Sequence, residues 1–196
     1  SAQRPVIEDI TFENASATAR KEKLHIVSYL TANMTDARNN FDKLDAVTDL
    51  ILFGRTSWTQ TGELDFGTEG TARFKRDLAE IREAIGSRQI DLWLCIGNFA
   101  AGSDRGKLLA DPADRKRLVD NCVSAAKRYD LVGIDVDYEY PADATAWDNY
   151  ALFLEELGTA LKKEGKLLSV ALSPWGVRLS KAAIRSIDRV NIMAYD

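Results

Sequence analysis

Three acidic side chains alternate with apolar ones in one short segment of the chain. Asp135, Asp137 and Glu139 stand at every second position, and they alternate with Ile134, Val136 and Tyr138. A β-strand places alternate residues on one face, so the carboxylates would share one face and the apolar side chains the other. Burying like charges side by side is unfavourable unless they share protons. Crowding and burial also raise a carboxyl pKa toward the value that a general acid needs, so the spacing predicts a catalytic site.

Metal binding is the main alternative to acid–base chemistry for such a cluster. A calcium-binding EF-hand loop needs Gly at its sixth position and Glu at its twelfth, but counting from Asp135 these positions hold Tyr140 and Ala146. The chain has a single histidine, His25, which rules out a paired-histidine zinc motif. We therefore expect no metal and no cofactor, and we interpret His25 as a buried or strand-edge residue.

The rest of the chain alternates short apolar runs with amphipathic stretches. The apolar runs have the length and β-branched content of strands buried on both faces, and they cover 24–30, 47–54, 90–97, 131–137, 167–173 and 190–195. Helical spacing and helix start signals predict helices at 71–85, 111–129, 145–163 and 179–187, with a further one within 35–46. Such alternation predicts parallel strands joined by right-handed crossovers.

The predicted fold is α/β, a (β/α)8 TIM barrel of which the chain contains about the first six β/α units. The segment 29–33, after the first strand, lacks the glycines of a dinucleotide-binding turn, which disfavours a doubly wound sheet. Barrel chemistry gathers at the C-terminal ends of strands, where Glu139, Asn98 and Asp196 would lie. We expect an N-terminal arm, 1–22, and a barrel domain, 23–196, whose remaining strands come from missing sequence or another chain.

The composition excludes several classes of function. A net charge of −4 offers no basic surface for nucleic acid, and no apolar run reaches the roughly 18 residues of a membrane span. The first residues do not form a signal peptide. Cys95 falls in a predicted strand and Cys122 in a predicted helix, so we interpret both as buried apolar residues rather than as a disulfide.

The acidic segment resembles the fourth-strand signature of glycoside hydrolase family 18, the chitinase family. That signature is Asp-x-x-Asp-x-Asp-x-Glu followed by an aromatic residue and Pro; here Val132 replaces the first Asp, and the acids are followed by Tyr140 and Pro141. Residues 191–196, Asn-Ile-Met-Ala-Tyr-Asp, match the family's sixth-strand Met-x-Tyr-Asp, and 96–99 resemble its third-strand Ser-x-Gly-Gly. The resemblance covers about residues 24–196.

The resemblance implies a retaining glycoside hydrolase whose substrate supplies the nucleophile. Glu139 would be the general acid and base, while the N-acetyl carbonyl oxygen of the sugar attacks the anomeric carbon. Asp137 would orient the acetamido group, Asp135 would share a proton with Asp137, and Tyr195 would donate its hydroxyl to the acetamido oxygen. The candidate substrate-binding residues, including two tryptophans after predicted strands two and five, are Met193, Asp196, Tyr29, Phe53, Asn98, Trp58 and Trp175.

The implied partner is an oligo- or polysaccharide that contains N-acetylglucosamine, cleaved at β-1,4 linkages as in chitin, and the expected location is secreted, periplasmic or cell-surface. An endo-β-N-acetylglucosaminidase acting on N-glycans would use the same acids, although Tyr140 and Pro141 favour the chitinase branch. A non-catalytic chitinase-like carbohydrate-binding protein is a further alternative; the retained Glu139 argues against it, and Val132 keeps it open. An interaction fragment without activity is the fourth.

Overall fold

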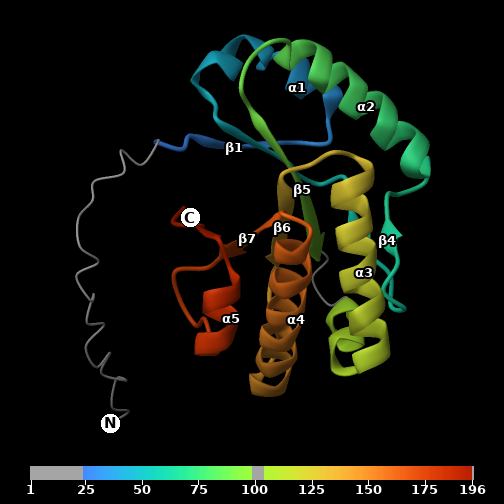
Figure 1. The fold of residues 1–196 in the computed structure, drawn as a ribbon, viewed down its shortest axis with the longest axis vertical. Helices are drawn as coiled ribbons and strands as arrows, with labels where there is room; N and C mark the ends of the chain where they lie inside the picture. Colours follow the sequence, from blue (N-terminus) through green and yellow to red (C-terminus); the bar gives the residue numbers. More distant parts are fainter. Residues whose placement is uncertain (1–23, 99–103, 196) are drawn as a thin grey trace.

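The computed structural model describes residues 24–98 and 104–195, in which six parallel strands form one curled sheet (Figure 1). The strands stand in chain order: β1 (Val27–Leu30), β2 (Asp49–Leu52), β5 (Asp91–Asn98), β6 (Gly133–Tyr138), β7 (Leu167–Leu172) and β8 (Arg189–Ile192). Every neighbouring pair is parallel. The six predicted strands are therefore confirmed, whereas the predicted arm, 1–22, lies outside the described residues.

Helices cover the outer face of the sheet and connect its strands. They are α1 (Met34–Arg38), the 3-10 helix η1 (Phe41–Ala46), α2 (Gly70–Ile85), the 3-10 helix η2 (Asp104–Ala110), α3 (Pro112–Arg128), α4 (Ala144–Lys163) and α5 (Lys181–Ser186). Figure 1 shows α2, α3, α4 and α5 following one another around the sheet. The four longer predictions are confirmed, and the stretch within 35–46 divides between α1 and η1. No helix in the described part of the chain has the length and apolar character needed to cross a bilayer.

Local sequence signals set the helix ends. The Asp111 side chain accepts hydrogen bonds from two backbone N–H groups at the start of α3, and Pro112 occupies the first turn. Asp143 and Ser180 cap α4 and α5 in the same way. The predicted apolar face of α2 is buried against the sheet, through Phe74, Leu78, Ile81 and Ile85.

A short antiparallel hairpin lies between β2 and α2, formed by β3 (Ser57–Trp58) and β4 (Leu64–Asp65). The sequence did not predict it, because two-residue strands are too short to show an alternating pattern. Its consequence is that Trp58 is completely buried.

The two faces of the sheet are packed differently. The outer face joins the helices in one large apolar core, whereas the apolar cluster of the inner face is small and is centred on Ile51, Trp93 and Cys95. Gly133 makes room for the Trp93 ring, since a Cβ at this position would lie 2.7 Å from a ring carbon. Val27 and Phe53 pack against this cluster, and polar side chains at other inner-face positions form the candidate site.

Candidate active site

The three predicted acids lie where the alternating pattern places them. Asp135 and Asp137 are on the inner face of β6, with exposed fractions of 0% and 3%, and Glu139 follows directly after the strand. Ile134 and Val136 are fully buried in the outer core. The chain therefore buries two carboxylates inside the curled sheet and places a third, partly exposed, at its C-terminal end.

Asp135 is surrounded by uncharged hydrogen-bond donors. The Tyr29 hydroxyl donates to one carboxylate oxygen at 3.2 Å and the Asn191 amide to the other at 3.3 Å. Ser169 and Cys95 also hydrogen-bond to it. Burial raises the pKa of Asp135, and these four hydrogen bonds only partly offset the effect of burial.

Asp137 holds a proton close to neutral pH. Burial raises its pKa to about 7, and the charges of Glu139 and Asp135 and a hydrogen bond with Glu139 act in the same direction. Its Oδ1 atom is buried without a hydrogen-bond partner among the described residues. Asp137 is therefore a carboxyl group that can exchange a proton with Glu139 and can still bind a polar group of a ligand.

Several of the predicted substrate-binding residues lie around these acids. The Tyr29 ring packs edge-to-face against Phe53, with centroids 5.9 Å apart. Met193 and Tyr195 follow β8, and Tyr195 is 71% exposed. Burial raises the pKa of Tyr140, as do the charges of Glu139, Asp137 and Tyr195, which places Tyr195 near the end of β6.

The other predicted contacts have different outcomes. Trp58 is not a platform for a sugar ring: it is fully buried and packs edge-to-face on Tyr138 at 5.9 Å, so neither ring face can reach a ligand. Trp175, after β7, is 79% exposed. Asn98 ends β5 beside Tyr138 of β6, and Asp196 lies outside the described residues.

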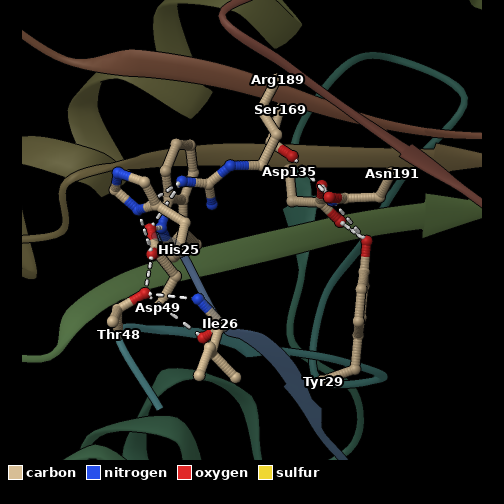
Figure 2. A network of polar contacts seen from close by, with 10 residues as sticks. His25, Ile26, Tyr29, Thr48, Asp49, Asp135, Ser169, Arg189 and Asn191 are labelled. Atoms are coloured by element: carbon tan, nitrogen blue, oxygen red, sulfur yellow. Dashed lines mark hydrogen bonds and ion pairs between the residues drawn. The ribbon is translucent and has the colours of Figure 1, made fainter. Parts of the chain in front are cut away.

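The sequence reasoning missed the donors that hold Asp135. Asn191 lies on β8 and donates at 2.9 Å to both the Tyr29 hydroxyl and Ser169 Oγ, so it connects three strands to the acid (Figure 2). Asn191 belongs to the segment that resembled the sixth-strand motif. It stands two residues before Met193, and this spacing on one strand face could have indicated that Asn191 also faces the site. Ser169 and Cys95 stand level with Asp135 on the neighbouring strands, which only the register reveals.

A second polar cluster occupies the opposite, N-terminal end of the inner face. Asp49, the first residue of β2, accepts hydrogen bonds from Thr48, Trp93 and Arg189 and contacts His25 Nδ1 at 2.7 Å (Figure 2). Burial favours a higher pKa for Asp49, but these hydrogen bonds lower it to about 2. Asp49 is thus a buried anion, with Arg189 as its cationic partner.

Cysteine thiols and metal-binding side chains are the other groups that could take part in a reaction. Cys95 and Cys122 are buried and free, as predicted. Burial raises the pKa of both thiols, and the charges of Asp135 and Asp137 add to this at Cys95. Within 24–98 and 104–195, no three His, Cys, Asp or Glu side chains gather as ligands for a metal ion. Asp135, Asp137 and Glu139 are therefore the arrangement best suited to acid–base chemistry.

Known proteins are similar to this chain in sequence and in fold. Over 112 residues the chain is 32% identical to a class V chitinase of Arabidopsis thaliana, covering 51% of the chain and 30% of that protein. It is 32% identical to chitinase 1 of Aphanocladium album over 123 residues, 56% of the chain and 29% of that protein. The class V chitinase of Nicotiana tobaccum, solved in complex with NAG4, superimposes with a TM-score of 0.74 at 25% identity, over 87% of this chain and 52% of that one.

A chitinase from Bacteroides thetaiotaomicron shares the fold with a TM-score of 0.75 at 19% identity, over 89% of this chain and 55% of that one. The chain thus spans about half the length of these solved structures and about 30% of the two curated relatives. The solved relatives identify the curled sheet as part of a TIM barrel. The family model described as "Glycosyl hydrolases family 18" matches residues 25–196, and the chain therefore belongs to this family.

Proposed function

We propose that the protein is a glycoside hydrolase that cleaves β-1,4 linkages next to N-acetylglucosamine, in chitin or chitooligosaccharides, by a retaining, substrate-assisted mechanism. The observation that carries the proposal is the burial of Asp135 and Asp137 on one face of β6 beside Glu139, since burial and these neighbouring charges raise the pKa of Asp137 to about 7. A general acid works best when its proton source has a pKa near the working pH. A protein that only bound the sugar would have no use for that proton.

The first step of the proposed reaction uses Glu139 as the acid. The proton held by Asp137 passes to Glu139, which protonates the glycosidic oxygen as the bond to the anomeric carbon breaks. The sugar's own N-acetyl carbonyl oxygen forms a new bond to that carbon, giving an oxazolinium ion. Asp137, now a carboxylate, accepts a hydrogen bond from the acetamido N–H and stabilises the positive charge. Asp135 shares a proton with Asp137, and Tyr195 donates to the acetamido oxygen.

The second step regenerates the site. Glu139 takes a proton from water, whose oxygen attacks the anomeric carbon and opens the oxazolinium ring. That proton then passes back from Glu139 to Asp137, which restores the starting state. Two inversions at one carbon leave the configuration retained. Since the nucleophile is an amide of the substrate, the substrate must be N-acetylated. Met193, Asp196, Tyr29, Phe53, Asn98 and Trp175 are the proposed substrate contacts. A secreted, periplasmic or cell-surface location remains a prediction.

The test is turnover by the full-length protein of fluorogenic N-acetylchitooligosaccharides and, separately, of a high-mannose glycopeptide. Glu139→Gln should lower kcat on the chitooligosaccharides by about 100-fold or more, because loss of general acid catalysis costs this much. Glu83→Gln, the same change on the exposed face of α2, is the matched control and should leave kcat unchanged. Turnover of the glycopeptide alone would establish the N-glycan alternative. Binding of the sugar without turnover would establish the non-catalytic one.

A further inference from the structure

Arg189 is the cation of the inner face, and its guanidinium is held at the N-terminal end of the sheet. Its NH2 group donates to Asp49 Oδ1 at 2.8 Å, and its central carbon lies 4.8 Å from the centroid of the Trp93 ring. The Asp49 side chain is 1% exposed and the Arg189 side chain 19%. Figure 2 shows the guanidinium turned toward His25 and Asp49. The cation is therefore fixed by a buried carboxylate and an aromatic face together.

The backbone of Arg189 is nevertheless level with Asp135. The strand register pairs Asp135 with Ser169 and Ser169 with Arg189, so two strand spacings, roughly 10 Å, separate the two α-carbons. Asn191, two residues further along the same face of β8, does reach Asp135. An arginine side chain is long enough to cover much of that distance. Its guanidinium points to Asp49 because Asp49 supplies the buried anion.

We propose that Asp49 is a positioning residue that keeps the Arg189 cation away from Asp135 and Asp137, so that these acids retain their shared proton. A carboxyl group with a nearby cation loses its proton at lower pH. Asp135 and Asp137 would then no longer hold a proton beside Glu139 near neutral pH. The inference rests on the proposed function only in giving that proton a catalytic use; the effect of Asp49 on the acids can be measured without turnover.

The charged and titratable groups around Asp49 and around the pair of Asp135 and Asp137 determine whether a substitution raises or lowers the pKa of these acids. Asp49 faces Arg189 and His25, together with the neutral donors of Thr48 and Trp93. Among the described residues, the ionisable groups around the acid pair include Glu139, Tyr29, Cys95, Tyr140 and Tyr150. A unit charge gained or lost at roughly 10 Å, the spacing derived for Arg189 and Asp135, moves a pKa by about one unit in a medium of dielectric constant about 20. The effect is smaller at Asp137, which lies two residues further along β6.

A charge cycle in the full-length protein tests the inference, using Asp49→Asn, Arg189→Gln and the double variant. Two quantities are measured: the pH titration of the Asp137 carboxyl carbon by NMR, and the alkaline limb of the kcat/KM profile on an N-acetylchitooligosaccharide, where activity falls as the acids lose their proton. Asp49→Asn leaves an uncompensated cation and should lower both midpoints by up to about one pH unit. Arg189→Gln leaves an uncompensated anion and should raise them, by less, since Asp49 can itself take up a proton. The double variant should return both to within a few tenths of the wild-type value.

Shifts of the Asp137 titration in opposite directions, in Asp49→Asn and in Arg189→Gln, would distinguish this role from a purely structural one. Arg115→Met, which breaks the buried pair with Glu156 between α3 and α4, is the control for lost stability and should leave the titration unchanged. The cycle is repeated with His25→Gln, because histidine is the side chain whose charge changes nearest to neutral pH. If Asp49→Asn or Arg189→Gln does not fold by itself, both substitutions are combined in the His25→Gln background. This combined variant buries no unpaired charge and is compared with His25→Gln alone.

The possible failures are separable. Equal or same-direction shifts from Asp49→Asn and Arg189→Gln would overturn the inference, as would an unmoved Asp137 titration in Asp49→Asn. Opposite NMR shifts in a protein without turnover would uphold the positioning role and reject the proposed hydrolase. Turnover with unmoved midpoints would uphold the hydrolase and reject the positioning role.

Discussion

Replacing Asp137 by Asn should stabilise the folded protein at alkaline pH while damaging the site. Asp137 is 3% exposed, and burial together with the charges of Glu139 and Asp135 raises its pKa from 3.8 to about 7. In the unfolded chain it ionises near pH 4, so between about pH 4 and pH 7 the folded protein binds a proton that the unfolded chain has lost. Stability therefore falls over this range and stays low above it.

The size of the effect follows from the pKa difference. Three pH units at about 1.4 kcal/mol each give an upper value of about 4 kcal/mol above pH 7. Part of the raised pKa comes from Glu139 and Asp135, which titrate themselves, so about 2–4 kcal/mol is expected. Asn has nearly the same shape and no charge. The variant should match the wild type at pH 4 and exceed its free energy of unfolding by this amount at pH 9.

The measurement is urea denaturation of wild type and Asp137→Asn at pH 4, 7 and 9. Asp120→Asn, the same substitution on the exposed surface of α3, controls for a general gain from lost negative charge. A variant less stable than wild type at pH 9, or a difference that does not change with pH, would refute the argument that Asp137 is buried at a cost in stability.

Two further predictions concern the residues around the acids. Tyr29→Phe removes a hydroxyl that donates to Asp135 but keeps the ring, so the pKa of Asp135 should rise. The acids would then keep their proton to higher pH, and the alkaline limb of the pH–rate profile should move to higher pH with KM little changed; an unmoved limb would contradict it. Trp58→Ala should cost about 3–5 kcal/mol of stability because Trp58 is fully buried. Trp175→Ala should cost under about 0.5 kcal/mol and weaken only the binding of chitooligosaccharides. Thermal unfolding measures the loss of stability, and calorimetry measures the binding.

The sequence predicted those features that depend on local periodicity. Alternation of acids with Ile134 and Val136 placed the carboxylates on one strand face, and both apolar residues are indeed in the outer core. The helices were predictable because their caps and apolar stripes are local signals. The order of the sheet followed from the alternation of strands and helices, since parallel neighbours need a crossover between them.

The sequence could not predict contacts that depend on curvature and register. Trp58 follows β2 by only a few residues, but a hairpin too short to show periodicity turns its ring into the core. Asp49 and Arg189 are separated by 140 positions and meet only because the sheet curls. Nothing in the local sequence distinguishes Arg189 from a solvated strand-end arginine, so the cluster at the N-terminal end had no signal.

Buried acids with lowered and raised pKa values make opposite contributions to the pH dependence of stability, and this predicts a maximum. Asp49 has a lowered pKa, whereas Asp137 and Asp135 have raised ones. The pKa of Asp49 is lowered to about 2, so its stabilising contribution of about 2 kcal/mol is complete above pH 4 and is lost as the pH falls toward 2. The penalty from Asp137 begins near pH 4 and is complete above about pH 7. Thermal unfolding followed from pH 2 to 9 should therefore show a maximum near pH 4–5. Asp49→Asn should flatten the acid side of this curve and Asp137→Asn the alkaline side. If either variant flattened the other side instead, the roles assigned to the two carboxylates would be wrong. The buried carboxylate with a cationic partner thus stabilises the fold above pH 4, whereas the one without such a partner lowers stability as it ionises.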